Sequence, residues 1–276
     1  MSTHLVRGVV RAEWIKLVST KQLQRYTALA VGLSVLITVL LGAAMGQYNS
    51  TCSQPGRSCR EGLMAMDDTI ATAGIIGDGT PGAGLIVVML LGATCVLVEY
   101  RYGTLATAYF ATPARGLVIG VKAAVAFAVG LVSTLLAGLL SALAFKVVAS
   151  SAAHDVQPWS ANAGGLYLRT ALVVALASAA AVGLAGAIRH TAGVISVVLL
   201  WPLLLEPLLP SLLPTYGERA AGLMPFVNAR RFIGLDTSGD FFWGPGWSGL
   251  YFAALALAAV AGGLVLVRAT DLRQPA

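Results

Sequence analysis

The sequence predicts an all-α membrane protein with six spanning helices, and three observations lead to that prediction. Hydrophobic residues make up 57% of the 276 residues and charged residues only 11%, compared with about 25% charged in an ordinary soluble domain. The mean hydropathy of +0.81 is too high for a surface that faces water. The apolar residues form long continuous runs, and such runs cross lipid as helices because a helix bonds its backbone polar groups internally.

Six apolar runs are long enough, or nearly long enough, to cross a membrane. A helix rises 1.5 Å per residue, so about 20 residues cross the roughly 30 Å hydrocarbon core. The second run is short, and we expect it either to begin inside the outer leaflet or to extend back through Ile75 and Ile76. The expected spans are residues 26–46, 83–98, 121–147, 168–188, 191–213 and 248–267. Together they form a single transmembrane domain over residues 1–276.

A basic amphipathic segment precedes the first span. Within residues 5–25, five apolar side chains fall within roughly a third of a helix circumference: Val6, Val10, Trp14, Leu17 and Val18. We expect a helix that lies in the membrane surface, anchored by Trp14 and by basic side chains that reach the headgroups. A frayed basic tail is the alternative.

The basic residues are unevenly divided between the two sides of the expected spans. Eleven lie on the side of the termini: Arg7, Arg11, Lys16, Lys21, Arg25, Arg101, Arg115, Lys122, Arg189, Arg268 and Arg273. The other side holds five, with Lys146 and Arg169 near helix ends. Since basic loops stay cytoplasmic, we expect a multi-pass protein of the cell membrane with both termini in the cytoplasm. The net charge of +6 therefore marks orientation, and no nucleic-acid partner is expected.

Motifs for catalysis are absent from the sequence. There is no Walker A motif for ATP hydrolysis, no H-E-x-x-H zinc helix and no G-x-S-x-G elbow. Gly77, Gly79 and Gly82 fit a G-x-G-x-x-G string, but Pro81 interrupts it and no strand precedes it. We therefore expect a chain that is not an enzyme and binds no cofactor of its own. An intramembrane hydrolase would also need a buried base, and the spans contain no histidine for that role.

The three cysteines are expected to have different fates. Cys52 and Cys59 lie on the expected outer face, with Pro55 and Gly56 between them to allow a turn. We expect these two to form a disulfide, because that compartment is oxidising. Two free or metal-bound thiols are the alternative. Cys95 lies inside a span and is expected to be a buried free thiol.

The segment after the second span predicts a short helix on the cytoplasmic face. Thr104 can cap its start, and Pro113 disfavours helical backbone at the preceding residue, so the helix is expected over residues 105–112. Two helical turns are not stable alone in water, so the helix either lies on lipid or docks into a partner. Its expected apolar anchors are Tyr109 and Phe110, with Arg101 and Arg115 at its edges. Glu99 and Arg101 are expected to brace the end of the span by bonding the neighbouring loop.

Three stretches of the sequence carry a resemblance to a known family. They are residues 11–17, Arg-Ala-Glu-Trp-Ile-Lys-Leu; residues 99–104, Glu-Tyr-Arg-Tyr-Gly-Thr, with Pro-Ala-Arg at 113–115; and the proline-rich residues 201–226. They resemble the amphipathic elbow, the Glu-x-Arg-x-Gly-Thr element with its following Pro-x-Arg, and the outer re-entrant hairpin between spans five and six of the permease subunits of type-2 ATP-binding-cassette (ABC) exporters. The resemblance is in particular to the compact six-span permeases common in actinobacteria.

The resemblance implies a bacterial exporter in which this chain supplies the membrane pathway. A second permease copy, identical or different, would complete the pathway, and two separate ABC ATPase subunits would bind ATP and Mg²⁺ and dock onto the short cytoplasmic helices. The implied docking residues are Glu99, Arg101, Gly103, Thr104, Tyr109, Phe110 and Arg115. Spans with almost no internal charge favour efflux of a lipophilic or amphipathic substrate. The alternative is a stand-alone secondary carrier, or a resistance or immunity membrane protein without an ATPase partner.

Prolines interrupt the fifth span. Pro202, Pro207, Pro210 and Pro214 each lack a backbone donor, so no straight helix is expected to continue through this stretch. Glu206 lies within it, and an ionisable group at membrane depth is by default a candidate for the transport pathway. A carboxylate that reaches headgroup water or caps a half-helix N-terminus is the alternative for Glu206.

Overall fold

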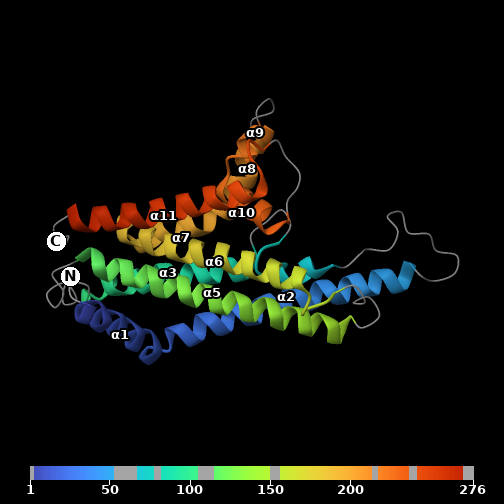
Figure 1. The fold of residues 1–276 in the computed structure, drawn as a ribbon, viewed down its shortest axis with the longest axis horizontal. Coiled ribbons are helices and arrows are strands. Elements are labelled where there is room, and N and C mark those ends of the chain that lie inside the picture. Colours follow the sequence, from blue (N-terminus) through green and yellow to red (C-terminus); the bar gives the residue numbers. More distant parts are fainter. Residues whose placement is uncertain are drawn as a thin grey trace.

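The structure is a computed structural model that describes residues 3–52, 67–77, 82–104, 115–149, 156–212, 217–235 and 241–269. Within these ranges every regular element is a helix, and six helical segments are long and apolar enough to cross a membrane. Figure 1 shows them aligned in one elongated bundle. The all-α, multi-pass fold predicted from the apolar runs is therefore confirmed.

The bounds of the helices follow the predicted spans, with several extensions. Five spanning helices are α2 (Gln22–Cys52), α3 (Ala83–Arg101), α5 (Arg115–Val148), α6 (Ala161–Ile188) and α11 (Pro245–Ala269). The other span combines α7 (Thr191–Leu200), the π-helix η2 (Trp201–Leu205) and α8 (Glu206–Ser211). Outside the spans lie α1 (Thr3–Ser19), the 3-10 helix η1 (Asp68–Thr72), α9 (Gly217–Ala221) and α10 (Pro225–Ile233).

The helices outrun the predicted spans because hydrogen bonding continues beyond the hydrocarbon core. At 1.5 Å per residue, α5 is roughly 50 Å long, against a core of about 30 Å. The second span does not extend back through Ile75 and Ile76, whose backbone N–H groups both bond to the carbonyl oxygen of Thr72 at 2.8 Å. Ile75 and Ile76 therefore belong to the turn that follows η1, and α3 begins separately at Ala83.

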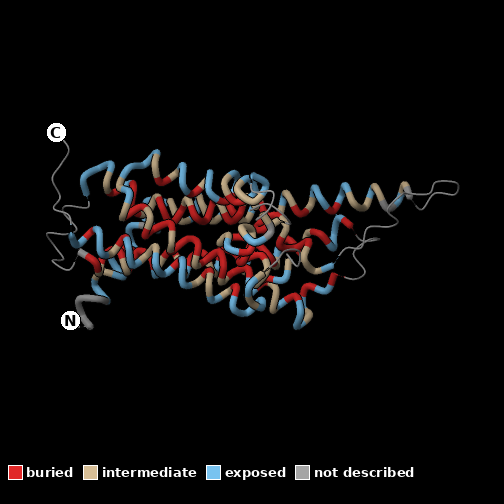
Figure 2. The backbone as a smooth tube through the Cα atoms, turned by 90° about the horizontal axis from the view of Figure 1, so that it is seen from above, coloured by how far each residue is buried: buried red, intermediate tan, exposed pale blue. Residues whose placement is uncertain are grey.

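The two ends of the bundle differ in what they hold. Figure 1 shows the start of α1 and the end of α11 at the same end, here called the termini end. The part of the bundle away from the termini, here called the far end, carries the end of α2 and, nearer the middle of the long axis in Figure 1, the group of α8, α9 and α10. Figure 2 shows that buried positions follow the central helices and that exposed positions cover the outer ones. The exposed positions on α2 include Leu29, Leu36 and Leu40, as expected of helices that face lipid.

The central helix α6 packs along α3, α5 and α11. Two of these contacts depend on glycine, because the backbones approach too closely for a side chain. A Cβ at Gly92 of α3 would clash with the carbonyl oxygen of Ser178 in α6. A Cβ at Gly183 of α6 would clash with the carbonyl oxygen of Ala259 in α11. Small residues permit this kind of backbone contact between membrane helices.

The N-terminal helix is shorter than predicted. It was expected over residues 5–25, but α1 ends at Ser19 and Gln22 already begins α2. Lys21 adopts a left-handed backbone with φ of 54°, which breaks the helix. The apolar arc is outward-facing, because Val10, Trp14 and Val18 are 42%, 50% and 42% exposed. This exposure fits a helix on the membrane surface rather than a frayed tail.

The proline-rich stretch stays helical but, as expected, does not run straight (Figure 1). The chain continues through Pro202, Pro207 and Pro210 to the end of α8. A π-turn makes this possible: the N–H of Glu206 bonds to the carbonyl oxygen of Trp201, five residues earlier, and the wider turn relieves the missing proline donor. The helix changes direction here, since Figure 1 shows α8 and α9 pointing away from the long axis of the bundle. Pro214 lies outside the described residues.

Candidate functional site

The last turn of α3 buries a carboxylate at the termini end. Cys95, Glu99 and Tyr102 follow one another at helical spacing and therefore lie on one face. Glu99 is only 7% exposed, whereas the adjacent Val98 is 41% exposed. The face that carries Glu99 thus points into the protein, and a buried carboxylate requires partners of opposite charge.

Lys122 of α5 supplies the first partner. Its side chain is 3% exposed, and its Nζ lies 3.0 Å from Glu99 Oε1. The same Nζ forms an ion pair with Glu13 Oε2. Lys122 lies roughly 10 Å along α5 from the start of the helix. An ammonium group so deeply buried would cost several kcal/mol if it were unpaired, so these contacts are needed for stability.

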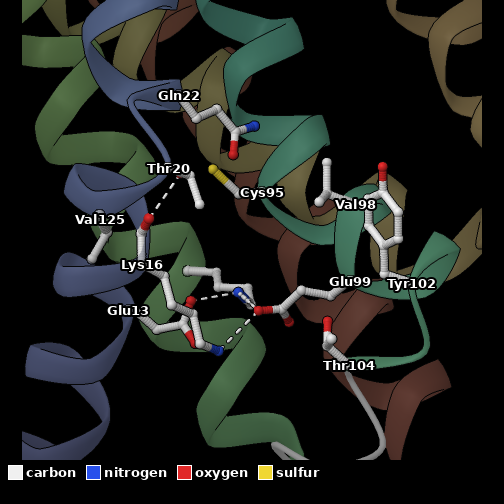
Figure 3. A pocket seen from close by; sticks show the side chains of 11 residues that line it. Glu13, Lys16, Thr20, Gln22, Cys95, Val98, Glu99, Tyr102, Thr104 and Val125 are labelled. Atoms are coloured by element: carbon white, nitrogen blue, oxygen red, sulfur yellow. Dashed lines mark hydrogen bonds and ion pairs between the residues drawn. The ribbon is translucent and has the colours of Figure 1, made fainter.

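The surface helix α1 completes the cluster. Lys16 Nζ lies 3.0 Å from Glu13 Oε1 and 2.9 Å from Glu99 Oε1. Glu13 is buried although most of α1 is exposed. The four side chains of Glu13, Lys16, Glu99 and Lys122, here called the four-charge cluster, join α1, α3 and α5 and carry no net charge (Figure 3).

Lys16 responds to both carboxylates. Its partial burial would lower the pKa of the ammonium group. The hydrogen bonds and negative charges of Glu99 and Glu13 outweigh that effect and raise the pKa of Lys16 above its ordinary value of 10.5. Lys16 is therefore protonated at neutral pH.

A cavity of about 430 Å³ lies beside the four-charge cluster. Its volume falls within the range of small-molecule sites. Figure 3 shows side chains from α1, α3 and α5 around it. Besides the cluster, it is lined by Thr20, Gln22, Cys95, Val98, Tyr102, Thr104 and Val125. Cys95 is a free thiol, as predicted, but it is only half-buried because it lines this cavity.

The predicted docking residues differ in their exposure. Arg101, Gly103 and Thr104 are exposed at the end of α3, where Gly103 adopts a φ of +68° that favours glycine. The guanidinium carbon of Arg101 lies 6.0 Å from the ring centre of Tyr102. Glu99 is buried, unlike these three, and the expectation that it bonds the neighbouring loop concerns residues 105–114, which lie outside the described residues. The partners of Glu99 in the described part of the chain are two lysines, because burial leaves the carboxylate in need of positive charge.

Several predicted residues lie outside the described residues. These are Tyr109 and Phe110, the rest of the expected helix over residues 105–112, and Cys59. Arg115 begins α5 and Cys52 ends α2, but their side chains are also outside the described part. The docking of this segment and the expected disulfide remain predictions.

Glu206 at the far end caps a helix. It is 2% exposed, and its Oε1 accepts a 2.8 Å hydrogen bond from the backbone N–H of Phe226. The same oxygen accepts a 3.2 Å bond from the indole N–H of Trp201. Phe226 is the second residue of α10, whose own N-cap, Met224, offers no side-chain acceptor. Glu206 therefore supplies from α8 the acceptor and negative charge that a helix N-terminus favours, as in the capping alternative.

Three members of the four-charge cluster were not identified as site residues from the sequence. Glu13 and Lys16 belong to the elbow-like stretch, and their spacing of three residues was a visible signal for a pair on one helix face. Lys122 was counted only as a basic residue on the side of the termini. Its position inside the long apolar helix α5 was the stronger signal, because intramembrane ionisable groups are expensive and need a partner.

The described part of the chain is thus a polytopic helical membrane protein with a buried ionic cluster and a cavity at one end. It contains no group of three or more His, Cys, Asp or Glu side chains that could hold a metal ion. No protein-family model matches the sequence, and no curated protein matches it either.

Proposed function

We propose that the chain is the membrane-spanning permease subunit of an ABC exporter. It moves a lipophilic or amphipathic substrate outward across the cell membrane, and a separate subunit hydrolyses ATP. The described apolar helices support a membrane pathway. Residues 99–104 resemble the docking element of such permeases, and this resemblance is the reason for proposing a separate ATPase subunit.

The position of the four-charge cluster is the observation that carries the proposal. Glu99 is the first residue of the docking-like element, and its carboxylate is bonded to side chains of α1 and α5. A force that a partner applies to the segment after α3 would therefore be transmitted to α1 and α5 through the ion pairs of Glu99. Gln22 adds a second connection, since its Nε2 donates to Thr94 Oγ1 of α3 at 2.8 Å. A device that converts work done by a partner into helix movement needs such rigid connections.

The location of the ionisable groups argues against the stand-alone carrier. Carriers place ionisable groups near the bilayer midplane to couple ions to substrate. Here the four-charge cluster lies at the termini end, and Glu206 lies at the far end of its span. The four-charge cluster is at the end of its helices, and Glu206 lies in the last third of the span Thr191–Ser211.

Association with an ATPase is tested by co-purification with the ATPase subunit encoded in the neighbouring reading frame. Tyr109→Ala combined with Phe110→Ala should weaken association by at least ~2 kcal/mol, the scale of an interface hot spot, which is roughly 30-fold. The matched control is Phe242→Ala combined with Trp247→Ala, which removes two exposed aromatic side chains, 59% and 68% exposed, from the far end. Equal retention of the ATPase by both double variants would contradict the proposal.

Orientation has its own test. Single cysteines at Ser2, Thr107, Asn162 and Thr237 are treated in intact cells with a membrane-impermeant thiol reagent. Cytoplasmic termini require labelling at Asn162 and Thr237 only. Labelling at Thr107 would show the opposite orientation. The proposed docking segment would then lie outside the cell, where an ATPase has no ATP.

A further inference from the structure

Glu99, which lines the cavity beside the four-charge cluster, has an unsatisfied acceptor. Glu99 uses Oε1 for both lysines, whereas its Oε2 is buried and has no hydrogen-bond partner. Figure 3 shows the Glu99 carboxylate pointing from α3 into the space between α1 and α5. A buried carboxylate oxygen without a donor is costly, on the order of 1–3 kcal/mol or more. The site therefore favours a ligand that brings a hydrogen-bond donor.

The charges of the cluster select the kind of ligand. Both ammonium groups in the wall are already engaged, Lys122 by two carboxylates and Lys16 by the same two. An anion would have to compete with these carboxylates for its partners. A cation with N–H groups meets no such competition, because it would bond to the oxygen that the lysines leave unused.

The rest of the lining suits a hydrocarbon chain. Val98, Val125 and Cys95 present apolar surface to the cavity. Val98 is 41% exposed, so this part of the lining is also accessible from outside the protein. Tyr102 adds an aromatic ring to the lining of the cavity, and an aromatic ring favours a neighbouring cation.

We propose that this cavity binds the primary ammonium group of an amphiphile, with Glu99 Oε2 as the acceptor and the hydrocarbon chain lying along Val98 and Val125. The ligand is either an aminated lipid headgroup of the surrounding bilayer or a free amphiphilic amine. The site does not depend on an ATPase partner, and its test requires none.

Cys95 reports on occupancy because it lies one helical turn from Glu99 in the same wall. The protein is placed in lipid nanodiscs of phosphatidylcholine, and methyl methanethiosulfonate modifies its thiols. Peptide mass spectrometry then gives the rate of reaction at Cys95. Three probes with the same chain are compared: dodecylamine, dodecyltrimethylammonium and dodecyl sulfate.

Dodecylamine should slow the reaction at Cys95 in the wild type. Dodecyltrimethylammonium has the same charge but no N–H, and dodecyl sulfate has the opposite charge, so both should protect about tenfold less well at equal concentration. Equal protection by all three probes would mean hydrocarbon partitioning only and would overturn the proposal. So would the absence of protection by dodecylamine, since the cavity would then hold water alone.

Two variants and a second lipid complete the test. Glu99→Gln should abolish the advantage of dodecylamine, whereas Glu206→Gln, which alters a buried carboxylate at the far end, should leave it unchanged. If Glu99→Gln does not fold, the comparison of probes on the wild type still decides. Nanodiscs with added phosphatidylethanolamine distinguish the two sources. Protection by this lipid as well as by dodecylamine identifies a site that accepts a lipid headgroup, and protection by dodecylamine alone identifies a free amine as the ligand.

Discussion

The two ends of the bundle bury a carboxylate in different ways. At the termini end, Glu99 is held by two ammonium groups that come from two other helices. At the far end, Glu206 is held by a backbone N–H and an indole N–H, both uncharged donors. In each carboxylate Oε1 is bonded, and Oε2 is buried without a partner.

This difference determines whether each carboxylate couples several helices or stabilises only one. The four-charge cluster is balanced only when all four members are present, so a change in one helix alters the charge balance of the others. Glu206 interacts with the N-terminus of α10, where the partial positive charge belongs to the backbone and cannot be lost by titration or by a side-chain substitution in α10. At the termini end, the cluster therefore couples α1, α3 and α5, whereas Glu206 stabilises only the start of α10.

Removal of the buried lysine should have the largest effect. Lys122→Met leaves Glu13 and Glu99 close together with only the half-exposed Lys16 between them. We expect a loss of about 3–5 kcal/mol in unfolding free energy, the usual cost of breaking a buried ion pair. Reversible unfolding in mixed micelles measures it.

The control for this substitution lies in the same helix. Lys146→Met removes an exposed lysine near the other end of α5 and should change stability by less than about 0.5 kcal/mol. The triple variant Glu13→Gln, Glu99→Gln and Lys122→Met should recover most of the loss, because no unpaired buried charge remains. Equal losses for the two lysines would show that the cluster is not coupled.

The same substitution at both ends gives the second comparison. Glu99→Gln deprives two lysines of a charged partner and should cost about 2–3 kcal/mol. Glu206→Gln keeps an oxygen acceptor for Phe226 and Trp201 and should cost less than about 1 kcal/mol. Glu206→Ala removes that acceptor and should cost about 1–2 kcal/mol, as for a lost helix cap. A Glu206→Gln variant as unstable as Glu99→Gln would remove the distinction between the two ends.

These contrasts also show which features the sequence could predict. Six spans follow from composition and run length, since only the local chain matters for that decision. Helix ends were less predictable. The left-handed backbone of Lys21, which separates α1 from α2, carries no glycine or asparagine signal, and the π-turn at Trp201–Leu205 is one of several ways for a chain to accommodate Pro202.

The ionic cluster could not be predicted as a unit. Lys122 and Glu13 are 109 positions apart, and nothing in either segment specifies the other as its partner. Only the packing of α1 against α5 brings them together. The docking-like element drew attention to Glu99 by its motif, but its burial depends on the same packing. By contrast, the capping of α10 by Glu206 was among the alternatives, because a carboxylate near a broken helix has few other partners.

The smallest expected effect concerns the pH dependence of the termini end. Because the pKa of Lys16 is raised above 10.5 by Glu99 and Glu13, its contribution to stability is fully present below pH 10.5 and is lost as the pH rises through the higher value in the folded protein. Lys16 is half-exposed, so this contribution should not exceed ~1 kcal/mol. Unfolding free energies of the wild type and of Lys16→Met, measured between pH 7 and pH 11.5, should differ by a constant amount at neutral pH and converge at the alkaline end. A difference that stays constant through the alkaline range would show that Lys16 stabilises α1 by packing of its stem, and that the charge coupling at this end runs through Lys122 alone.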